Sequence, residues 1–540
     1  MAIRQLHGSH SGENQAEVVI QVIDEFNLRP RVGYFITDNA KNNDTAINII
    51  LEKIFPSMPL KRRLARRLRC LGHVINLAAK AFLYGADFDA FETGVENLRQ
   101  APELLKELNL WRKRGPVGKL HNIITFISRS PQRRSQFASL RPLGPGEKGD
   151  FDHLTLVVDN ATRWNSLYSM VERALKLRDR IDRFCIDHAE QMHGSKVGRP
   201  ANKDEEAQLL KHDQLTGDDW LALTEVLNIL KRFYDLTKRA EGKSLSANRG
   251  VLSDYMATLN QLVTHMRAKR DDLEFRAQNP DYCTESLQFL RQCSVNCWTK
   301  LDEYFSKVND TPAHYASVVT NPKMKWRYFE VTWKDVESWK DATDPSDWLP
   351  SGKLALGEIW QEYKELSVQS QGPITGSKRP RSPDDFERAT NMALLTDEEE
   401  LDELESWIST RPFELDQSES LPQFWLRQRK TNPRLAQMGL DMASIPAMSS
   451  ECERVFSQGK LLITGQRNRL RADIIEATQC LRMWLIMDRK AAGLWKDHKG
   501  DEKPRWVTPL EVYNPDEDPE EASEDKGSLD TEEDTRGNAQ

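Results

Sequence analysis

Apolar residues recur at helical spacing through most of the chain. The segment 14–26 places them at Ala16, Val19, Ile20 and Ile23, which predicts an amphipathic helix. Between about 75 and 365 the same spacing continues and predicts a mainly helical middle. Two stripes show it most clearly, the first at Leu223, Val226, Leu227, Leu230 and Phe233, the second at Leu287, Leu290, Val295 and Trp298.

A β-rich run breaks this helical pattern near the start. The letters VGYFITDNA at 32–40 end in Asp38, and helical spacing resumes over 45–55. A strand, an acidic turn and a helix in this order are typical of an α/β domain that places a carboxylate at the end of a strand. We therefore predict a fold that combines an α/β part with a larger, mainly α part.

Composition divides the rest of the chain. Residues 367–388 are polar and rich in Pro, Gly and Ser, which predicts a disordered linker. A second loop is predicted over 194–216. The segment 514–540 contains eleven acidic residues and only two basic ones, Lys526 and Arg536, which predicts an acidic tail. The segment 407–495 between linker and tail is predicted to form a compact module.

Hydrophobic residues make up 39% and charged residues 29% of the 540, which is ordinary for a globular protein with disordered segments. No stretch approaches eighteen consecutive apolar residues, so no membrane span is expected. The first residues lack the apolar core of a secretory signal. The seven cysteines are odd in number and scattered, which favours reduced thiols inside the cell.

The net charge of −7 hides a local positive cluster at 61–69, KRRLARRLR, with six basic residues in nine. Leu64, Leu68 and Leu71 follow at i, i+4 and i+7, which predicts an amphipathic helix with arginines on its other face. Arg62, Arg63, Arg66 and Arg67 could then line a phosphate backbone. A merely solvated basic face is the alternative. The mutual repulsion of six cations without an anion nearby favours the DNA contact.

Cys70 and His73 suggest zinc, but no second ligand pair follows at finger spacing, so no zinc is expected. Cys293 and Cys297 lie on a helical stripe and are predicted to pack in the core. Near the C-terminal end, one continuous, mostly apolar helical face is formed by Ile474, Ala477, Thr478, Leu481, Trp484 and Leu485.

Three blocks of sequence together resemble the hAT superfamily of DNA transposases. The first is GSHSGEN, GYFITDNAKNND and RRLRCLGHVINLAAKAFL. The second is WRKRGPVGKLHNIITFISRSPQRRSQF with DNATRWNSLYSMVERAL. The third runs from LPQFWLRQRK through ECERVFS and RNRL to QCLRMWL. They follow the order and spacing of that family over roughly residues 5 to 490.

The resemblance implies a ribonuclease-H-like catalytic fold interrupted by a large helical insertion. The implied domains are a partial catalytic domain at 1–90, a helical insertion at 91–365, a linker at 366–400, a dimerisation module at 401–495 that completes the catalytic fold, and a tail at 496–540. The homodimer would form through the face at 474–485. The implied location is the nucleus, and the implied partner is DNA.

In this family, carboxylates at strand ends hold the divalent metal ions that activate an attacking oxygen at phosphorus. Asp38 matches the second catalytic Asp of the family, and Glu453 in ECERVFS matches its catalytic Glu. Both would be ligands of Mg²⁺. Taken alone, an Asp after a strand is usually a turn former and a helix Glu is usually a surface residue. Glu451 would face differently on the helix and is the poorer candidate.

The first catalytic Asp of the family belongs to a strand upstream of residue 1, and no residue here corresponds to it. We therefore expect a transposase-derived, DNA-contacting homodimer without catalytic activity as the sequence stands. The alternative is the C-terminal part of an active cut-and-paste transposase whose N-terminus is missing from the sequence.

Four further residues match family positions near the DNA. Cys70 and His73 match a C-x-x-H element near the active site, where His73 could contact a phosphate or be purely structural. Arg163 and Trp164 match a position near the flanking-strand hairpin that forms during excision, where Trp164 could stack on an unpaired base and Arg163 could hold its phosphate. Equally, Trp164 could begin a core helix that continues through Leu167 and Met170.

Overall fold

The computed structural model describes residues 3–85, 87–100, 104–140, 154–159, 164–193, 210–241, 250–280, 283–333, 348–365, 402–416, 418–462 and 470–491. The chain divides into two compact units. The larger contains residues 8–450, and the smaller contains residues 1–7 together with 451–540. Each unit is described by itself.

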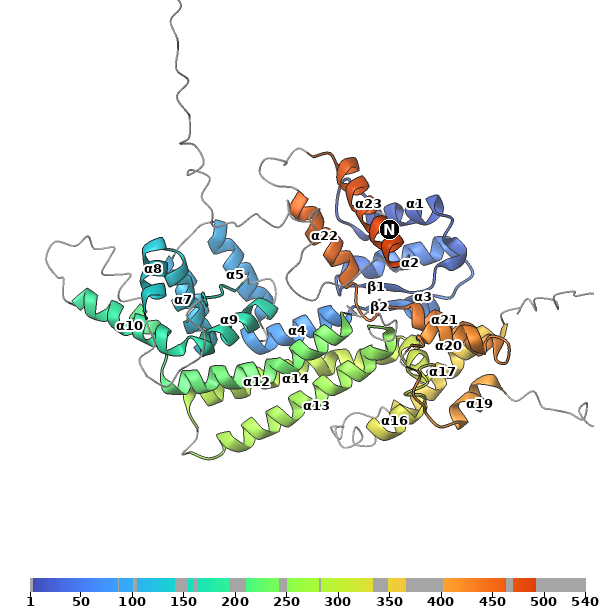
Figure 1. Cartoon of the computed structure of the whole chain (residues 1–540). Coiled ribbons are helices and arrows are strands. Elements are labelled where there is room, and N and C mark those ends of the chain that lie inside the picture. Colours follow the sequence, from blue (N-terminus) through green and yellow to red (C-terminus); the bar gives the residue numbers. More distant parts are fainter. Residues whose placement is uncertain are drawn as a thin grey trace, which may run out of the picture. The chain divides into compact units, whose positions relative to one another are not determined.

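The helices and strands follow one another along the chain, and Figure 1 labels most of them. The elements of the first 140 residues are α1 (Gly12–Glu25), η1 (Arg29–Arg31), β1 (Phe35–Thr37), α2 (Lys41–Ile54), α3 (Leu60–Leu64), β2 (Arg67–Arg69), α4 (Leu71–Tyr84), α5 (Phe88–Gln100), α6 (Leu104–Arg112), α7 (Gly115–Ser128) and α8 (Pro131–Ser139). Those of the middle are α9 (Trp164–Lys176), α10 (Arg178–His193), α12 (Gly217–Ala240), α13 (Leu252–Ala277), α14 (Glu285–Ser306), η2 (Lys307–Asp310), α15 (Ala313–Val319), α16 (Arg327–Thr332) and α17 (Trp348–Glu365). The C-terminal ones are α19 (Glu403–Ser409), α20 (Leu421–Gln428), α21 (Pro433–Ser444), α22 (Ser450–Leu462) and α23 (Ala472–Ala491).

The α/β part that the sequence predicts is small in the described residues. Its sheet consists of the three-residue strands β1 and β2, which pair in parallel with Ile36 opposite Leu68. Ser11 begins α1 by accepting a hydrogen bond from the Asn14 backbone N–H. Helices α1 and α2 pack on each other through a separate small core that includes Ala16 and Ile50. The protein is therefore mostly helical, with few strands.

The main core forms around α4 and three long helices. Helix α14 packs along α4 and α13, and α12 packs against α13 (Figure 1). The predicted stripe on α12 is confirmed, because Leu223, Val226 and Phe233 are all buried. Cys293 and Cys297 on α14 are buried as predicted, and burial raises the pKa of the Cys297 thiol well above its usual value. These two cysteines are therefore packing residues.

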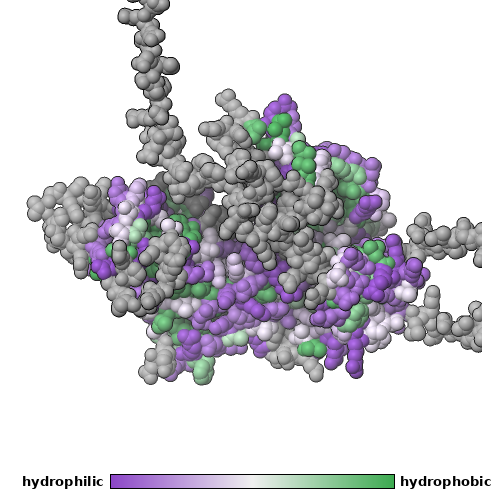
Figure 2. Space-filling view, in the orientation of Figure 1, coloured by the Kyte–Doolittle hydropathy of each residue, from purple (hydrophilic) through white to green (hydrophobic). Residues whose placement is uncertain are grey.

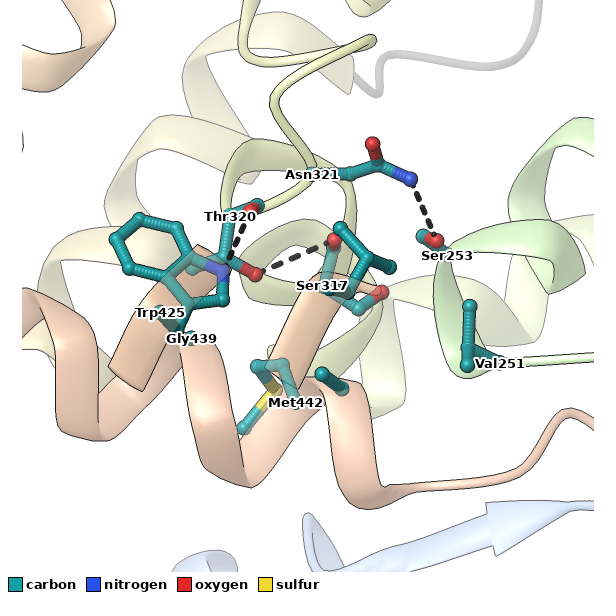
Figure 3. Close-up of a pocket in the computed structure, with 10 residues that line it drawn as sticks. Val251, Ser253, Ser317, Thr320, Asn321, Trp425, Gly439 and Met442 are labelled. Atoms are coloured by element: carbon teal, nitrogen blue, oxygen red, sulfur yellow. Dashed lines mark hydrogen bonds between the residues drawn. The ribbon is translucent and has the colours of Figure 1, made fainter. Parts of the chain in front are cut away.

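Helices α20 and α21 join the large unit through a tryptophan. Trp425 on α20 is buried against Gly439 on α21, and its indole N–H donates to the Thr320 carbonyl at 3.1 Å (Figure 3). A cavity of about 10 Å³ lies beside this contact. The segment 401–495 is therefore divided between the two units. Its residues up to 450 belong to the larger unit, and those from 451 onward belong to the smaller one.

The segment 447–449, which leads into α22, is held by hydrogen bonds of its backbone to two other segments. The backbone of Ala447 accepts from the Leu71 N–H at 3.1 Å and donates to the Gly250 carbonyl at 2.8 Å. The Ser449 N–H donates to the Cys70 sulfur at 3.3 Å. The starts of α4 and α13 therefore hold the chain immediately before α22 begins.

No helix in the described part of the chain is both long and apolar enough to cross a membrane.

Candidate nucleic-acid interface and dimerisation surface

The ends of β1 and β2 bring several polar residues together. Because the two strands are parallel, Asp38 and Asn39 after β1 lie at the same edge as Cys70 after β2. Arg67 and Arg69 project from β2 beside them. The Arg67 guanidinium donates to the Asp38 backbone carbonyl at 2.9 Å. This edge therefore carries the negative charge of the Asp38 carboxylate next to the positive charge of Arg67.

Asp38 is exposed at this edge and shapes the turn into α2. One carboxylate oxygen accepts from the Ala40 N–H at 3.0 Å and from the Asn43 amide at 2.6 Å. This is the geometry of an Asx turn, so Asp38 forms the turn with one carboxylate oxygen.

The residues around Asp38 do not by themselves fit a magnesium ion. Its neighbours are amides and guanidinium groups, and Arg67 is ion-paired with Asp44 at 2.7 Å. Within the described residues, no group of three or more His, Cys, Asp or Glu side chains could hold a metal. Glu453 is exposed on α22, and α22 lies in the smaller unit from residue 451 onward. The assignment of Asp38 and Glu453 as metal ligands therefore stays a prediction.

Tyr304 at the end of α14 joins this edge, and no sequence pattern predicts this. The Asn39 amide donates to the Tyr304 hydroxyl at 2.9 Å, and Arg69 donates to the Asn39 amide oxygen at 3.2 Å. Burial raises the pKa of Tyr304, so its hydroxyl stays protonated. The three residues form a hydrogen-bonded chain that fixes the loop after β1. Only the fold brings Tyr304 to Asn39, since no local pattern links them.

The prediction of one amphipathic basic helix over 61–71 is wrong. Helix α3 ends at Leu64 and β2 begins at Arg67, so Leu64 is half exposed while Leu68 is buried in the main core. The pairing of β2 with β1 overrides the helical spacing of the leucines.

The chain itself supplies the anions that this basic run needs. Each of the four arginines of this run that are predicted to contact DNA has a carboxylate partner. The ion pairs are Arg62 with Glu362, Arg63 with Glu52 at 3.3 Å, Arg66 with Glu362 at 3.6 Å, and Arg67 with Asp44 at 2.7 Å. The repulsion that favoured a bound phosphate is therefore already relieved within the protein.

Cys70 is a buried structural residue. It precedes α4 directly, is almost wholly buried, and accepts the hydrogen bond from the Ser449 N–H described above. His73 lies half-buried on the first turn of α4. A phosphate contact by His73 stays a prediction.

Trp164 packs in the core of the structure, and its contact with an unpaired base stays a prediction. It is 3% exposed at the start of α9, and its ring lies 6.3 Å from that of Phe233. Leu167 and Met170 on the same helix are fully buried, which confirms the core-helix alternative. Arg163 lies outside the described residues.

The predicted dimerisation face on α23 is open to solvent. The exposed fractions are 48% for Ile474, 55% for Leu481, 52% for Trp484 and 53% for Leu485, and Ala477 is exposed beside them. The opposite side of α23 is covered, since Gln479 is 1% and Cys480 6% exposed. Figure 2 shows hydrophobic side chains gathered where Figure 1 draws α23. Packing within the chain therefore uses the other side of the helix.

Comparison with known proteins finds two matching family regions in the chain. Residues 403–485 match the hAT family C-terminal dimerisation region, and residues 68–212 match the ZBED1 RNase-like helical domain. The chain thus carries a hAT dimerisation domain and a ZBED1-like domain, with hAT-family relatives over most of its length.

Three relatives illustrate the similarity. A protein from Talaromyces stipitatus, named as the transcriptional regulator tpeD, is 28% identical over 51% of this chain and 29% of its own length. A protein from Zea mays, named as an AC transposase, is 20% identical over 92% of this chain and 54% of its own. The BED-domain zinc-finger protein RICESLEEPER 2 from Oryza sativa is 19% identical over 88% of this chain and 59% of its own. The chain spans about a third to three fifths of the length of these relatives.

Proposed function

We propose that the chain is a nuclear, DNA-contacting homodimer of hAT-transposase descent. The observation that carries the proposal is the apolar face of α23, which is exposed within the region that matches the hAT dimerisation region. A continuous apolar face costs free energy in water, and a second copy of the same face removes that cost by symmetric burial.

The composition of the face supports a dimer interface. It joins Trp484 to Leu481 and Leu485 on adjacent turns, and tryptophan is enriched among the residues that dominate interface energies. Helix α22 carries another exposed aromatic residue, Phe456, which is 68% exposed. The side of α23 away from the face is held within its own unit, where Arg4 pairs with Glu476.

The test is sedimentation velocity of the full chain carrying Leu481→Asp. A fully buried leucine contributes about 1.5–3 kcal/mol, and Leu481 has about half its surface left to bury, so two copies together contribute roughly 1.5–3 kcal/mol. An unpaired carboxylate at the interface adds a further cost of several kcal/mol. The dimer dissociation constant should therefore rise by at least about a hundredfold.

The matched control is Leu221→Asp on α12, where the leucine is 70% exposed and far in sequence from the region that matches the hAT dimerisation region. It should leave the dimer intact. A Leu481→Asp chain that still dimerises like the control would show that the interface lies elsewhere. Unfolded protein would show that the face is internal core.

The DNA contact is supported by the relatives and by the basic run on α3 and β2. Without a base-reading finger in the described residues, binding should be independent of sequence and should weaken steeply with salt, since phosphate contacts dominate. A binding constant that barely changes between 50 and 200 mM salt (roughly the range over which phosphate contacts are lost) would contradict this part of the proposal.

One observation favours a second candidate, the catalytic part of a cut-and-paste transposase. Asp38 stands at the carboxyl end of a strand in a parallel pair, where the fold of such enzymes places its acidic residues. A protein extended upstream by a strand with a further Asp would test it in a magnesium-dependent cleavage assay. Cleavage that Asp38→Ala abolishes would establish this candidate.

A further inference from the structure

Helix α17 places carboxylates against the basic helix α3. Glu358 accepts two hydrogen bonds from the Lys61 ammonium, at 2.9 and 3.2 Å. One turn later, Glu362 is ion-paired with Arg62 and, at 3.6 Å, with Arg66. Three of the six basic residues in the run are thus neutralised by a helix that follows them by almost 300 positions in the sequence.

These pairs differ from the other pairs of the same run. Arg63 and Arg67 pair with Glu52 and Asp44 on the adjacent helix α2, and their side chains are only 11% and 6% exposed. The Lys61 side chain is 83% exposed and that of Arg62 40% exposed, whereas that of Arg66 is 18% exposed. Water and salt screen exposed pairs strongly, so the pairs of Lys61 and Arg62 to α17 hold the fold together only weakly.

A groove of about 710 Å³ opens beside the exposed pairs. Lys61 and Arg62 line it from α3, Arg66 lines it from the turn after α3, and Glu358 and Glu362 line it from α17. The groove lets a ligand approach the cations from solvent without any helix moving aside.

Helix α17 is also anchored independently of these glutamates. The Trp360 indole N–H donates to Asp402 at 2.8 and 2.9 Å, and the Tyr363 hydroxyl donates to Asp441 at 2.8 Å. Glu358 and Glu362 can therefore change rotamer and release the cations while α17 keeps its place.

We propose that Glu358 and Glu362 form an autoinhibitory acidic cover over Lys61 and Arg62 of α3 and over Arg66 in the turn after it, and that a DNA backbone displaces this cover. The carboxylates occupy the positions that phosphate oxygens would take on Lys61, Arg62 and Arg66. A polyanion presents several phosphates to the groove at once and replaces both carboxylates, whereas a small anion meets the same carboxylates one pair at a time. The inference rests on the proposed DNA contact and adds its regulation.

The experiment measures binding of a fluorescent DNA duplex to the full chain by anisotropy at several salt concentrations. Glu362→Gln removes the partner of two arginines. Its matched control is Glu365→Gln, which makes the same change of charge on the same groove, although Glu365 has no ion pair within the described residues. Glu358→Gln tests Lys61 separately.

Glu362→Gln should bind DNA about two- to thirtyfold more tightly than the unsubstituted chain at low salt, as expected from releasing one exposed and one partly buried ion pair. Glu365→Gln should change binding less than about twofold, and the difference should vanish at high salt. Inorganic pyrophosphate should not compete with the duplex at equal phosphate concentration.

Equal binding by Glu362→Gln and Glu365→Gln, with measurable binding by the unsubstituted chain, would overturn the cover while leaving the DNA contact intact. Failure of every variant to bind at low salt would instead refute the DNA contact, and the cover with it. Effective competition by pyrophosphate would show that the groove takes small anions and would overturn displacement by a polyanion.

Discussion

Gly439 on α21 and Gly357 on α17 are both interior helix glycines, yet a methyl group should have opposite effects at the two positions. At Gly439 an added Cβ would overlap the indole carbons of Trp425, whereas at Gly357 it would meet nothing within 4 Å. We predict that Gly439→Ala destabilises the packing of α20 and α21 and that Gly357→Ala stabilises α17.

The magnitudes follow from three contributions. Replacing glycine by alanine inside a helix stabilises it by about 1 kcal/mol, and this applies at both positions. Overpacking at Gly439 costs about 1–3 kcal/mol, because Trp425 is 1% exposed and has no room to move aside. A shifted Trp425 also loses its hydrogen bond to Thr320, which costs about 1 kcal/mol. Gly439→Ala should therefore lose about 1–3 kcal/mol, and Gly357→Ala should gain about 1 kcal/mol.

Hydrogen exchange followed by mass spectrometry suits this comparison, because it reports the local stability of each helix in a protein of two compact units. Peptides from α20 and α21 should exchange roughly five- to a hundredfold faster in Gly439→Ala, and peptides from α17 should exchange more slowly in Gly357→Ala. Unchanged exchange of α20 and α21 in Gly439→Ala would refute the reasoning, since it would mean that Trp425 accommodates the methyl group without cost.

Three further predictions concern catalysis, location and pH. A polypeptide of these 540 residues should show negligible DNA cleavage or strand transfer with Mg²⁺ or Mn²⁺, and robust cleavage abolished by Asp38→Ala and by Glu453→Ala would contradict this. The basic residues at 378–381 (KRPR), outside the described residues, should promote nuclear import, so replacing them with alanine should reduce nuclear accumulation of a fluorescent fusion; unchanged accumulation would exclude them as the main signal. Burial lowers the pKa of Lys325 to about 8 from 10.5, so the folded chain binds fewer protons than the unfolded chain between these values. The free energy of unfolding should therefore rise from pH 8 toward 10.5, and Lys325→Met should remove that part of the rise. Denaturation of both chains at pH 7.5 and 9, about half a unit below and one unit above the folded pKa, would measure the difference.

The sequence by itself determined the features that depend on local pattern. The helical stripe of α12 was predicted correctly because buried positions at 3.6-residue spacing need no knowledge of their partner. The core placement of Cys293 and Cys297 followed from the same spacing. The hAT dimerisation region was recognisable from its motifs, and the face at 474–485 could be identified before it was known to be exposed.

Tertiary structure alone decided which polar and aromatic residues are exposed and unpaired, and so free to contact a partner. The leucine spacing at 64–71 predicts a helix, yet pairing with β1 makes part of it a strand, because a parallel partner outweighs local propensity. Trp164 fits a base-stacking role as well as a core role in sequence, and only the packing of α9 against α12 buries it. The charge of α3 likewise depends on Glu358 and Glu362, which lie almost 300 residues away. Ion pairs between distant segments follow from the path of the chain through space, and local sequence carries no record of that path.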